Sequence, residues 1–340
     1  MDLMRKVLVI AFVFSLLSCK DEVPGPPPPD GPDTTSHDFS WSVDTIGTFQ
    51  SSLSDAWGTG PDNVYAVGFV FLPNRSTPTN IVHWDGTIWS PIDYLEGDLR
   101  SIIGFGPNDI WVAGFWQVGQ ELYALIGHWD GTQWQTSIMQ QHEGLFSIWG
   151  TSSSNLFACG WAGTILHFNG TAWTSMYAGT SHPLYGIWGV GNEVYSVGGD
   201  PSTGMGVLLK YQGNNVWKKM YERTYRPDSL SGDQQAIWAE RGDRFFVQKY
   251  MGHDSTWVKL PVPNDNTYIQ NTFGSRENNI FMVGHFGLLT HFNGSTWKRY
   301  DQFFWQPGND FLSGGWANER TVFVVGMTGG ARAIVIRGVR

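Results

Sequence analysis

Apolar residues recur along the chain in short runs that end in glycine. A polar residue, a largely apolar run and a glycine follow one another six times, as NVYAVG (63–68), DIWVAG (109–114), NLFACG (155–160), EVYSVG (193–198), NIFMVG (279–284) and TVFVVG (321–326), and RFFVQK (244–249) is a degraded seventh copy. Runs this short, rich in β-branched and aromatic residues, predict β-strands rather than helices.

Flanking segments extend each copy to a unit of four strands. A short apolar segment precedes it, as in SIWG (147–150). A third run follows and ends at Asp-Gly or Asn-Gly, as in ILHFNGTAW (165–173), and these dipeptides favour hairpin turns because both residues tolerate positive φ. A tryptophan then opens the fourth strand, at Trp41, Trp89, Trp134, Trp173, Trp217, Trp257 and Trp297. Their mean spacing, about 43 residues, is typical of a β-propeller blade.

The two ends of the chain complement each other. Trp41 opens a fourth strand that no other strand precedes, whereas the last unit stops after its third strand, ARAIVIRG (331–338). We therefore predict an all-β fold over residues 39–340, a seven-bladed β-propeller of four-stranded antiparallel blades, in which residues 39–45 complete the last blade. The fifth unit departs from the pattern, because Trp238 and Trp257 are unusually close, so a three-stranded blade or a swapped hairpin is open there.

The hairpin motif resembles that of bacterial propellers of the sialidase-like and photosystem-assembly-factor-like groups. Their hairpins between the third and fourth strands carry an Asp-Gly turn before a tryptophan. Asp85-Gly86-Thr87-Ile88-Trp89 is similar to the Asp box of sialidases, except that Asp and Gly are adjacent here. The resemblance covers residues 39–340 and implies the fold more than any activity.

The N-terminus has the features of an export signal. Two basic residues, Arg5 and Lys6, precede an apolar run, 7–17, that is too short to span a membrane. The next residues, LLSC (16–19), resemble the bacterial lipobox, which implies a signal peptide at 1–18 and a lipid, such as palmitate, on Cys19. An ordinary signal peptide with a chance cysteine is the alternative.

The segment after Cys19 predicts where the protein would be held. KDE (20–22) resembles the surface-export signal of Bacteroidota lipoproteins, and residues 23–36 contain six prolines, which favour an extended chain. We expect residues 19–38 to form a lipidated linker. The protein would then be an outer membrane lipoprotein, bound to the membrane through its lipid and exposed at the cell surface.

Composition narrows the candidate chemistry. The chain has 30 acidic and 21 basic residues and a net charge of −9. Without a basic stripe it is a poor candidate for binding nucleic acid. We predict no cofactor and no catalytic residue. Cys159 is expected to be a core residue, and the tripeptide RGD (241–243) is expected to be a turn rather than an adhesion motif.

Repeated polar residues have structural explanations. One histidine precedes the hairpin turn in each of four units, at His83, His128, His167 and His291, and one Asp or Asn opens each turn, at Asp85, Asp130, Asn169 and Asn293. Equivalent positions in different blades are separated around the ring, so the histidines cannot share a metal ion. We expect each histidine to be hydrogen-bonded within its own blade and each turn residue to accept local backbone N–H groups.

The variable connections carry the candidate binding residues. Connections from second to third strands and from fourth to first strands vary in length, and both kinds lie on one face of a propeller. This face therefore predicts the binding site. Its long segments, among them 115–124, 220–235 and 300–310, hold aromatic and arginine residues suited to a protein or glycan partner. The candidates are Trp116, Tyr221, Arg223, Tyr225, Arg226, Phe304 and Trp305. The alternative is that these aromatics plug the channel mouth or pack on neighbouring loops.

These features favour a cell-surface binding or scaffold module for a protein or glycan. A glycoside-acting enzyme of the sialidase kind is one alternative, since such enzymes need an arginine cluster, a Tyr–Glu pair and an acid. Tyr221, Glu222, Arg223 and Arg226 are of these types. They are adjacent in one segment, however, rather than spread over several blades, which argues against an enzyme. An assembly factor for an envelope protein complex is the other alternative.

Overall fold

The computed structural model describes residues 34–340, except for 74, 93–94, 191–192, 201–204, 225–268, 277 and 304–310. The chain divides into two units, residues 1–33 and 34–340, and the whole first unit, with Cys19, lies outside the described residues. The regular secondary structure of the described residues consists of strands and two 3-10 helices, η1 (Trp161–Gly163) and η2 (Asp301–Phe303). No helix within these residues is long and apolar enough to span a membrane.

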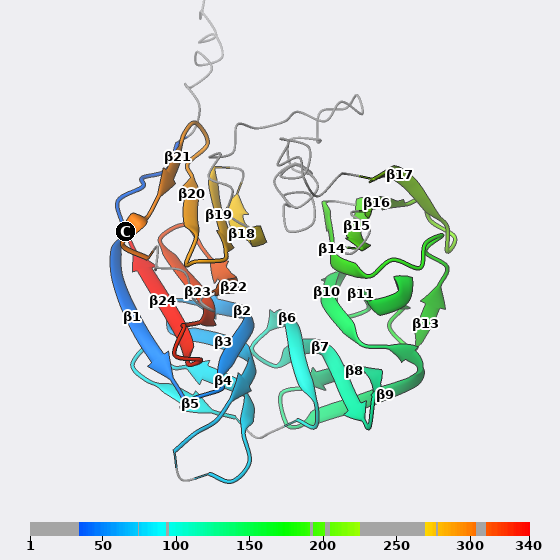
Figure 1. Ribbon diagram of the computed structural model, residues 1–340, viewed down its shortest axis with the longest axis horizontal. Coiled ribbons are helices and arrows are strands. Elements are labelled where there is room, and N and C mark those ends of the chain that lie inside the picture. The colour runs from blue at the N-terminus through cyan, green and yellow to red at the C-terminus, as the bar shows by residue number, and fades with distance from the viewer. Residues whose placement is uncertain are drawn as a thin grey trace, which may run out of the picture. The chain divides into compact units, whose positions relative to one another are not determined.

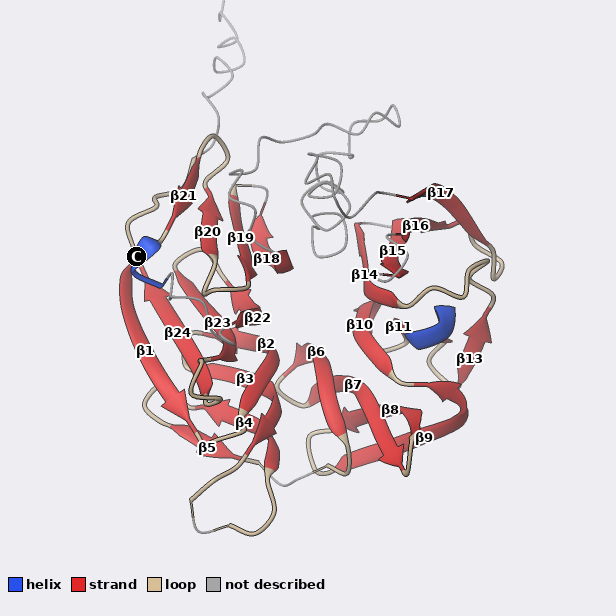
Figure 2. Ribbon diagram, in the orientation of Figure 1, coloured by secondary structure: helices blue, strands red, loops and turns tan. Residues whose placement is uncertain are grey.

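The strands form six antiparallel sheets of four strands each in the described residues (Figures 1 and 2). In chain order the sheets are β2 (Ser52–Gly60), β3 (Asn63–Val70), β4 (Thr79–Trp84) and β5 (Trp89–Pro91); β6 (Asp98–Gly106), β7 (Asp109–Val118), β8 (Glu121–Trp129) and β9 (Trp134–Glu143); β10 (Leu145–Ser152), β11 (Asn155–Gly160), β12 (Ile165–Phe168) and β13 (Trp173–Met176); β14 (Leu184–Val190), β15 (Glu193–Asp200), β16 (Met205–Tyr211) and β17 (Trp217–Thr224); β18 (Ile269–Arg276), β19 (Asn279–Gly284), β20 (Leu289–Phe292) and β21 (Trp297–Arg299); and β22 (Phe311–Ala317), β23 (Thr321–Met327) and β24 (Ala333–Val339) with β1 (Ser40–Ile46).

The predicted architecture is confirmed as a β-propeller of four-stranded antiparallel blades. The first strands of consecutive sheets pack against one another in the order β18, β22, β2, β6, β10 and β14. The described residues show six blades, one fewer than the predicted seven. The strands predicted for the fifth blade fall within 225–268, outside the described residues, where the repeat is degraded to RFFVQK (244–249).

The predicted closure by an N-terminal strand is also confirmed. β1 pairs antiparallel with β24, so that Trp41 lies opposite Gly338 and Ile46 opposite Ala333. Together with β22 and β23 they make one four-stranded sheet. Residues 34–39 are also bonded to the propeller, since Tyr300 Oη donates to the His37 carbonyl oxygen at 2.8 Å. Residues 34–39 therefore belong to the same unit as the propeller strands.

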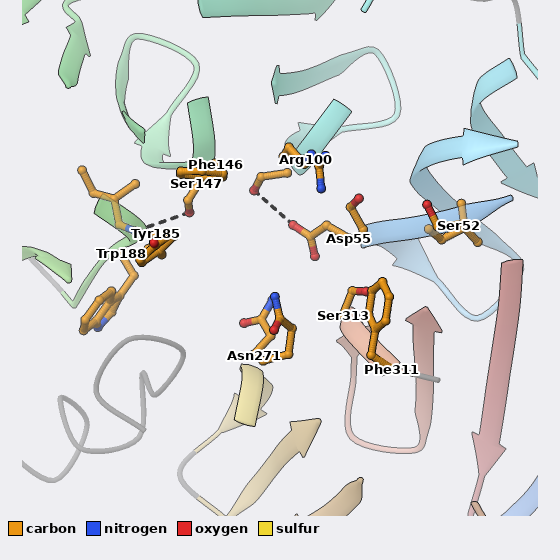
Figure 3. A pocket seen from close by; sticks show the side chains of 16 residues that line it. Ser52, Asp55, Arg100, Phe146, Ser147, Tyr185, Trp188, Asn271, Phe311 and Ser313 are labelled. Carbon is orange, nitrogen blue, oxygen red and sulfur yellow. Dashed lines mark hydrogen bonds between the residues drawn. The ribbon is translucent and has the colours of Figure 1, made fainter. Parts of the chain in front are cut away.

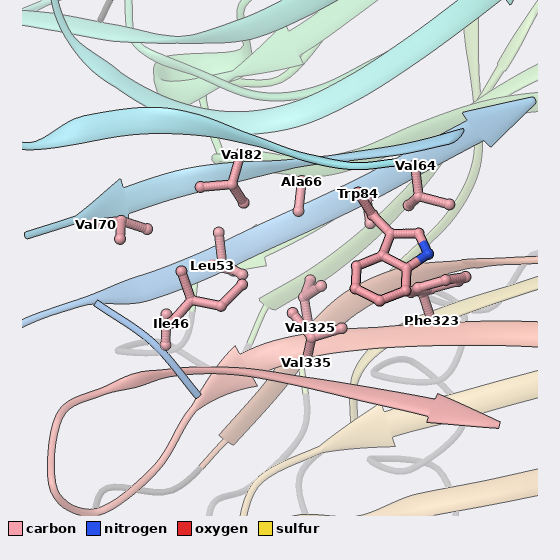
Figure 4. Close-up of a cluster of buried hydrophobic side chains, with 12 residues drawn as sticks. Ile46, Leu53, Val64, Ala66, Val70, Val82, Trp84, Phe323, Val325 and Val335 are labelled. Carbon is pink, nitrogen blue, oxygen red and sulfur yellow. The ribbon is translucent and has the colours of Figure 1, made fainter. Parts of the chain in front are cut away.

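Apolar residues between neighbouring blades form the core. Figure 4 shows the cluster between the first and last blades, where Leu53, Val64 and Trp84 meet Phe323 and Val335. The recurrent Trp-Gly pair of the first strands connects successive blades. A Cβ atom on Gly189 would lie 2.4 Å from the Trp149 ring, so the ring of one blade occupies the space left by the glycine of the next.

The glycine that ends the six-residue repeat, within the second strand, is needed for a different reason. A Cβ atom on Gly114 would lie 1.9 Å from the Asp98 carbonyl oxygen, and one on Gly198 would lie 1.9 Å from that of Pro183. In both cases the obstacle is backbone at, or directly before, the first residue of the neighbouring first strand. The repeat therefore keeps glycine where the first and second strands approach most closely.

As predicted, the repeated histidines are hydrogen-bonded within their own blades and the turn residues accept local backbone N–H groups. Each histidine Nε2 donates to the side-chain oxygen at the start of the second strand of its own blade, at 2.7–3.0 Å, in the pairs His83–Asn63, His128–Asp109, His167–Asn155 and His291–Asn279. Each turn residue accepts two backbone N–H groups, as Asp85 Oδ1 does from Thr87 and Ile88 at 2.8 and 2.9 Å. Asp130, Asn169 and Asn293 do the same.

We expect the buried His291 to make the protein less stable in acid. Burial, aided by the nearby His37, Arg340 and Lys298, lowers the pKa of His291 to about 2, whereas in the unfolded chain a histidine has a pKa of about 6.5. Below pH 6.5 only the unfolded state gains this proton, so stability falls as pH falls, by about 2 kcal/mol at pH 5. Urea denaturation at pH 7.5 and pH 5 measures the loss. His291→Gln should show a smaller loss, and an unchanged pH dependence in that variant would contradict the assignment.

Candidate functional site

The first strand of every described blade contains a β-bulge at the same place. The register shifts between Leu53 and Asp55 in β2, between Leu99 and Ser101 in β6, and at the equivalent position of β10, β14, β18 and β22. A bulge adds one residue to a strand and redirects its side chain. The residues at the bulges are Ser54, Arg100, Phe146, Tyr185, Gln270 and Ser313.

These six residues line a cavity of about 210 Å³, which we term the channel mouth (Figure 3). It is lined by residues 52–55, 100–101, 146–147, 185–188, 270–271, 311 and 313, and so by the first strands of all six described sheets. Most lie at the starts of those strands, next to the variable connections. The short turns lie on the other face, where a Cβ atom on Gly86 would be 3.0 Å from the Asp62 Cβ. The channel mouth therefore opens on the face predicted for binding.

Polar side chains just after the bulges connect neighbouring blades. Asp55 Oδ2 accepts from Ser101 Oγ at 3.1 Å and from the Ile102 amide at 3.2 Å, both in the next blade. Ser147 Oγ similarly accepts from the Ile187 amide at 3.3 Å. Asp55 Oδ1 also accepts from the Ala56 amide at 2.9 Å. These bonds give Asp55 and Ser147 structural roles.

Arg100 provides a positive charge at the channel mouth. Its guanidinium donates to Asp98 Oδ2 at 2.9 Å and lies 5.1 Å from the centre of the Phe115 ring. Burial raises the pKa of Asp98, and the adjacent Arg100 opposes this shift. The Arg100 side chain remains 40% exposed. It is therefore held in place but still accessible to a ligand.

Three aromatic rings extend from the channel mouth to a variable connection. The Phe146 ring centre lies 5.1 Å from that of Tyr185 and 4.9 Å from that of Trp161. Trp161 belongs to η1, between β11 and β12, whereas Phe146 and Tyr185 occupy bulges of adjacent blades. All three side chains are partly exposed. They form a continuous aromatic surface, which we call the aromatic row.

The structure places Trp116 on a strand rather than in an irregular loop. β7 and β8 continue through 115–124 and turn at Gly119, whose φ is +63°, so the prediction of a loop there was wrong. The Trp116 ring lies 6.2 Å from that of Tyr123, its cross-strand partner. The extension follows from the β-forming residues on both sides of one tight glycine turn. Trp116 does not line the channel mouth.

The structure describes only some of the other predicted binding residues. Tyr221 and Arg223 lie on β17, paired with Leu208 and Gly206 of β16, so the predicted 220–235 loop begins later than expected. Phe303 ends η2 and is buried. The remaining candidates, Tyr225, Arg226, Phe304 and Trp305, fall outside the described residues, as does the RGD tripeptide.

Sequence reasoning missed Arg100, Phe146 and Tyr185. Their signal was present in the first-strand pattern, where two residues stand between a leucine and the next apolar residue in β2, β6, β10 and β14; β18 has isoleucine in place of leucine, and in β18 and β22 the pair is followed by Thr272 and Gly315. Strict alternation allows only one such residue, so the pair marks a bulge. Read blade by blade, the pairs are Ser-Asp, Arg-Ser, Phe-Ser, Tyr-Gly, Gln-Asn and Ser-Gly.

Other candidate chemistry is not supported in the described part of the chain. No three metal-ligating side chains of the described residues are close enough to hold an ion. Cys159 is fully buried, and its thiol donates to the Leu184 carbonyl oxygen at 3.3 Å. Burial raises the pKa of this thiol to about 12, so Cys159 acts as a core residue, as predicted.

No protein-family model matches the sequence, and a search of curated proteins finds no match. Among solved structures the chain is similar to "YCF48 bound to D1 peptide", with 15% identity, a TM-score of 0.60, and coverage of 90% of this chain and 99% of that one. It is also similar to YCF48 from Cyanidioschyzon merolae, with 12% identity, a TM-score of 0.56 and coverage of 88% and 99%. YCF48 is a photosystem assembly factor. These similarities confirm the propeller fold.

Proposed function

We propose that this protein is a non-enzymatic binding module whose channel mouth captures a segment of a partner protein. The observation that carries the proposal is the convergence of Arg100, Phe146 and Tyr185 from three consecutive blades on one cavity. Arginine and aromatic residues contribute most of the binding energy at protein interfaces. The similar structure of YCF48 was solved with a peptide, which supports a peptide as the ligand class.

The size of the cavity favours a peptide segment over a folded domain. About 210 Å³ is smaller than most small-molecule pockets, which occupy about 300–1,000 Å³. It therefore has room for one or two side chains. The aromatic row would hold the adjoining part of the segment outside the cavity. A glycan is the second candidate, because the same rings could stack on sugars.

An enzyme is less well supported. Glycoside hydrolysis usually needs two carboxyl groups about 5–10 Å apart. Asp55 supplies the one carboxylate among the described residues of the channel mouth. It already accepts three hydrogen bonds, and two of them, from Ser101 and Ile102, connect it to the next blade. This favours a binding role over the sialidase-like alternative.

We also propose that the protein has a lipid anchor and a seventh blade. Residues 1–18 would be removed as a signal peptide, and Cys19 would carry lipid in the outer membrane, with residues 19–38 presenting the propeller at the cell surface. The seventh blade would lie between β14 and β18. Among the described strands, these two do not make the contact that joins every other consecutive pair of first strands. A protein held in this way could act as a scaffold or as an assembly factor for an envelope complex.

We expect a photo-crosslinking residue at position 185 to capture the partner on intact cells. The matched control is position 177, where Tyr177 is 83% exposed but does not line the channel mouth. Against the partner so identified, Tyr185→Ala should weaken binding about tenfold or more. Tyr177→Ala should leave binding unchanged. Equal capture at both positions, or unchanged affinity of Tyr185→Ala, would contradict the assignment.

A further inference from the structure

The fourth strand of the second blade differs from the other outer strands in length. β9 has ten residues, whereas β5 and β21 have three and β13 has four. Its pairing with β8 is regular from Trp134, opposite Trp129, to Met139, opposite Ala124, and after a register shift Glu143 lies opposite Tyr123. The sheet order β6-β7-β8-β9 leaves β9 at the edge. A long edge strand offers backbone groups to another strand.

The other long outer strands carry residues that discourage pairing, and β9 does not. Proteins protect sheet edges with short strands, charged residues or proline. β17 has two adjacent lysines, Lys218 and Lys219, and β1 has Asp44. β9 contains no proline, no lysine and no arginine, and its one acidic residue, Glu143, is the last residue of the strand. The regularly paired part of its edge, from Trp134 to Met139, therefore carries no charged residue and no proline.

The side chains of β9 are exposed on both faces of the strand. Residues 135–138 are all exposed, and Ile138 is 36% exposed. Hydrogen-bonded and non-hydrogen-bonded pairs alternate in an antiparallel ladder. Because the Asp130 amide donates to the Gln133 carbonyl, this alternation directs the backbone groups of Thr136 and Ile138 away from β8. These groups are placed to bond a further strand.

We propose that β9 pairs with β9 of a second copy of this chain, antiparallel and about a two-fold axis through Ser137. Thr136 of one copy would then face Ile138 of the other, and the outward N–H and C=O groups of these two residues would form the hydrogen bonds. The two four-stranded blades would join into one sheet of eight strands. The pairing surface lies on the outer rim of the blade, away from the channel mouth, so the proposal does not depend on the binding function.

The composition of β9 favours a second copy over a foreign strand. The two-fold register places Gln135 opposite Met139 and Ser137 opposite itself, and none of these residues is charged. Cross-strand pairs of β-branched residues, such as Thr136 with Ile138, are favourable. A strand selected for a foreign partner would gain specificity from charges, which β9 lacks. Two-fold dimers are also the commonest oligomers.

Cysteine crosslinking in membranes of cells that produce the full chain tests the pairing. In the proposed register the Cβ atoms of the two copies of residue 137 lie about 5 Å apart, so Ser137→Cys should give a disulfide-linked dimer on mild oxidation. Ser175→Cys, an exposed serine on β13, is the matched control and should remain monomeric. A Ser137→Cys variant that gives no more dimer than Ser175→Cys would overturn the proposal.

A second measurement uses charge rather than crosslinking. The purified chain should sediment as a dimer at concentrations above about 10 μM, because a single strand pair buries too little area for tight association. Ser137→Lys, which places two lysines opposite each other, should be monomeric with an unchanged Tm, and Ser175→Lys should remain dimeric. A wild-type chain that stays monomeric throughout, or binds only a strand of another protein, would refute self-pairing.

Discussion

Replacing Gly114 with alanine is expected to lower the free energy of unfolding by about 3 kcal/mol or more. The added Cβ would lie 1.9 Å from the Asp98 carbonyl oxygen and 2.9 Å from the Leu99 Cα, both backbone atoms of β6. Neither can rotate away as a side chain could, so β6 and β7 would have to separate next to the bulge that carries Arg100. Urea denaturation of the variant and the wild type measures the difference.

Gly106→Ala is the matched control for this prediction. Gly106 lies in the same blade, at the end of β6, and a Cβ atom there would meet nothing within 4 Å. Its substitution should change stability by less than about 1 kcal/mol. If both variants lost the same stability, backbone crowding could not be the reason for the glycine that ends the six-residue repeat.

Features set by a few adjacent residues could be predicted from the sequence. Asp85 and Gly86 define a hairpin turn through their own conformational preferences, and the structure confirms the turn and its hydrogen bonds. A hydrogen bond of His83 within its own blade could be predicted because the repeat places an equivalent histidine in four blades, and the structure identifies Asn63 as its partner. Closure by β1 was predictable from what the last blade lacked, since each repeat needs four strands.

Features that depend on pairing between distant residues could not be predicted from the sequence. The strands around Trp116 extend past the repeat because Phe115 pairs with Ala124 and Val118 with Glu121. Their polar tip residues resemble a loop in the sequence. The channel mouth was missed because a bulge changes which face a residue occupies, and alternation alone does not reveal it. Arg100 and Phe146 therefore became candidates only when the register was known.

One aromatic side chain of the closing strand contacts both its own sheet and the neighbouring blade. The Trp41 ring centre lies 4.7 Å from that of Tyr300 and 5.3 Å from that of Phe303, both in the neighbouring blade. The ring also covers Gly338 of β24, where a Cβ atom would lie 2.6 Å from it. Trp41 thus holds β1 both to its own sheet and to the blade beside it.

Trp41→Ala is therefore expected to lower the free energy of unfolding by about 3 kcal/mol. This is at the lower end of the range for a buried tryptophan, because the Trp41 side chain is partly exposed. Val43→Ala is the control, since Val43 lies on the same face of β1 but is 49% exposed, and it should cost less than about 1 kcal/mol. Because β1 belongs to the last blade, loss of its packing should expose the β24 edge before the other blades unfold. Hydrogen exchange should then show faster exchange in β24 than in β8 for Trp41→Ala alone. Equal exchange in both strands would mean that closure does not depend on this ring.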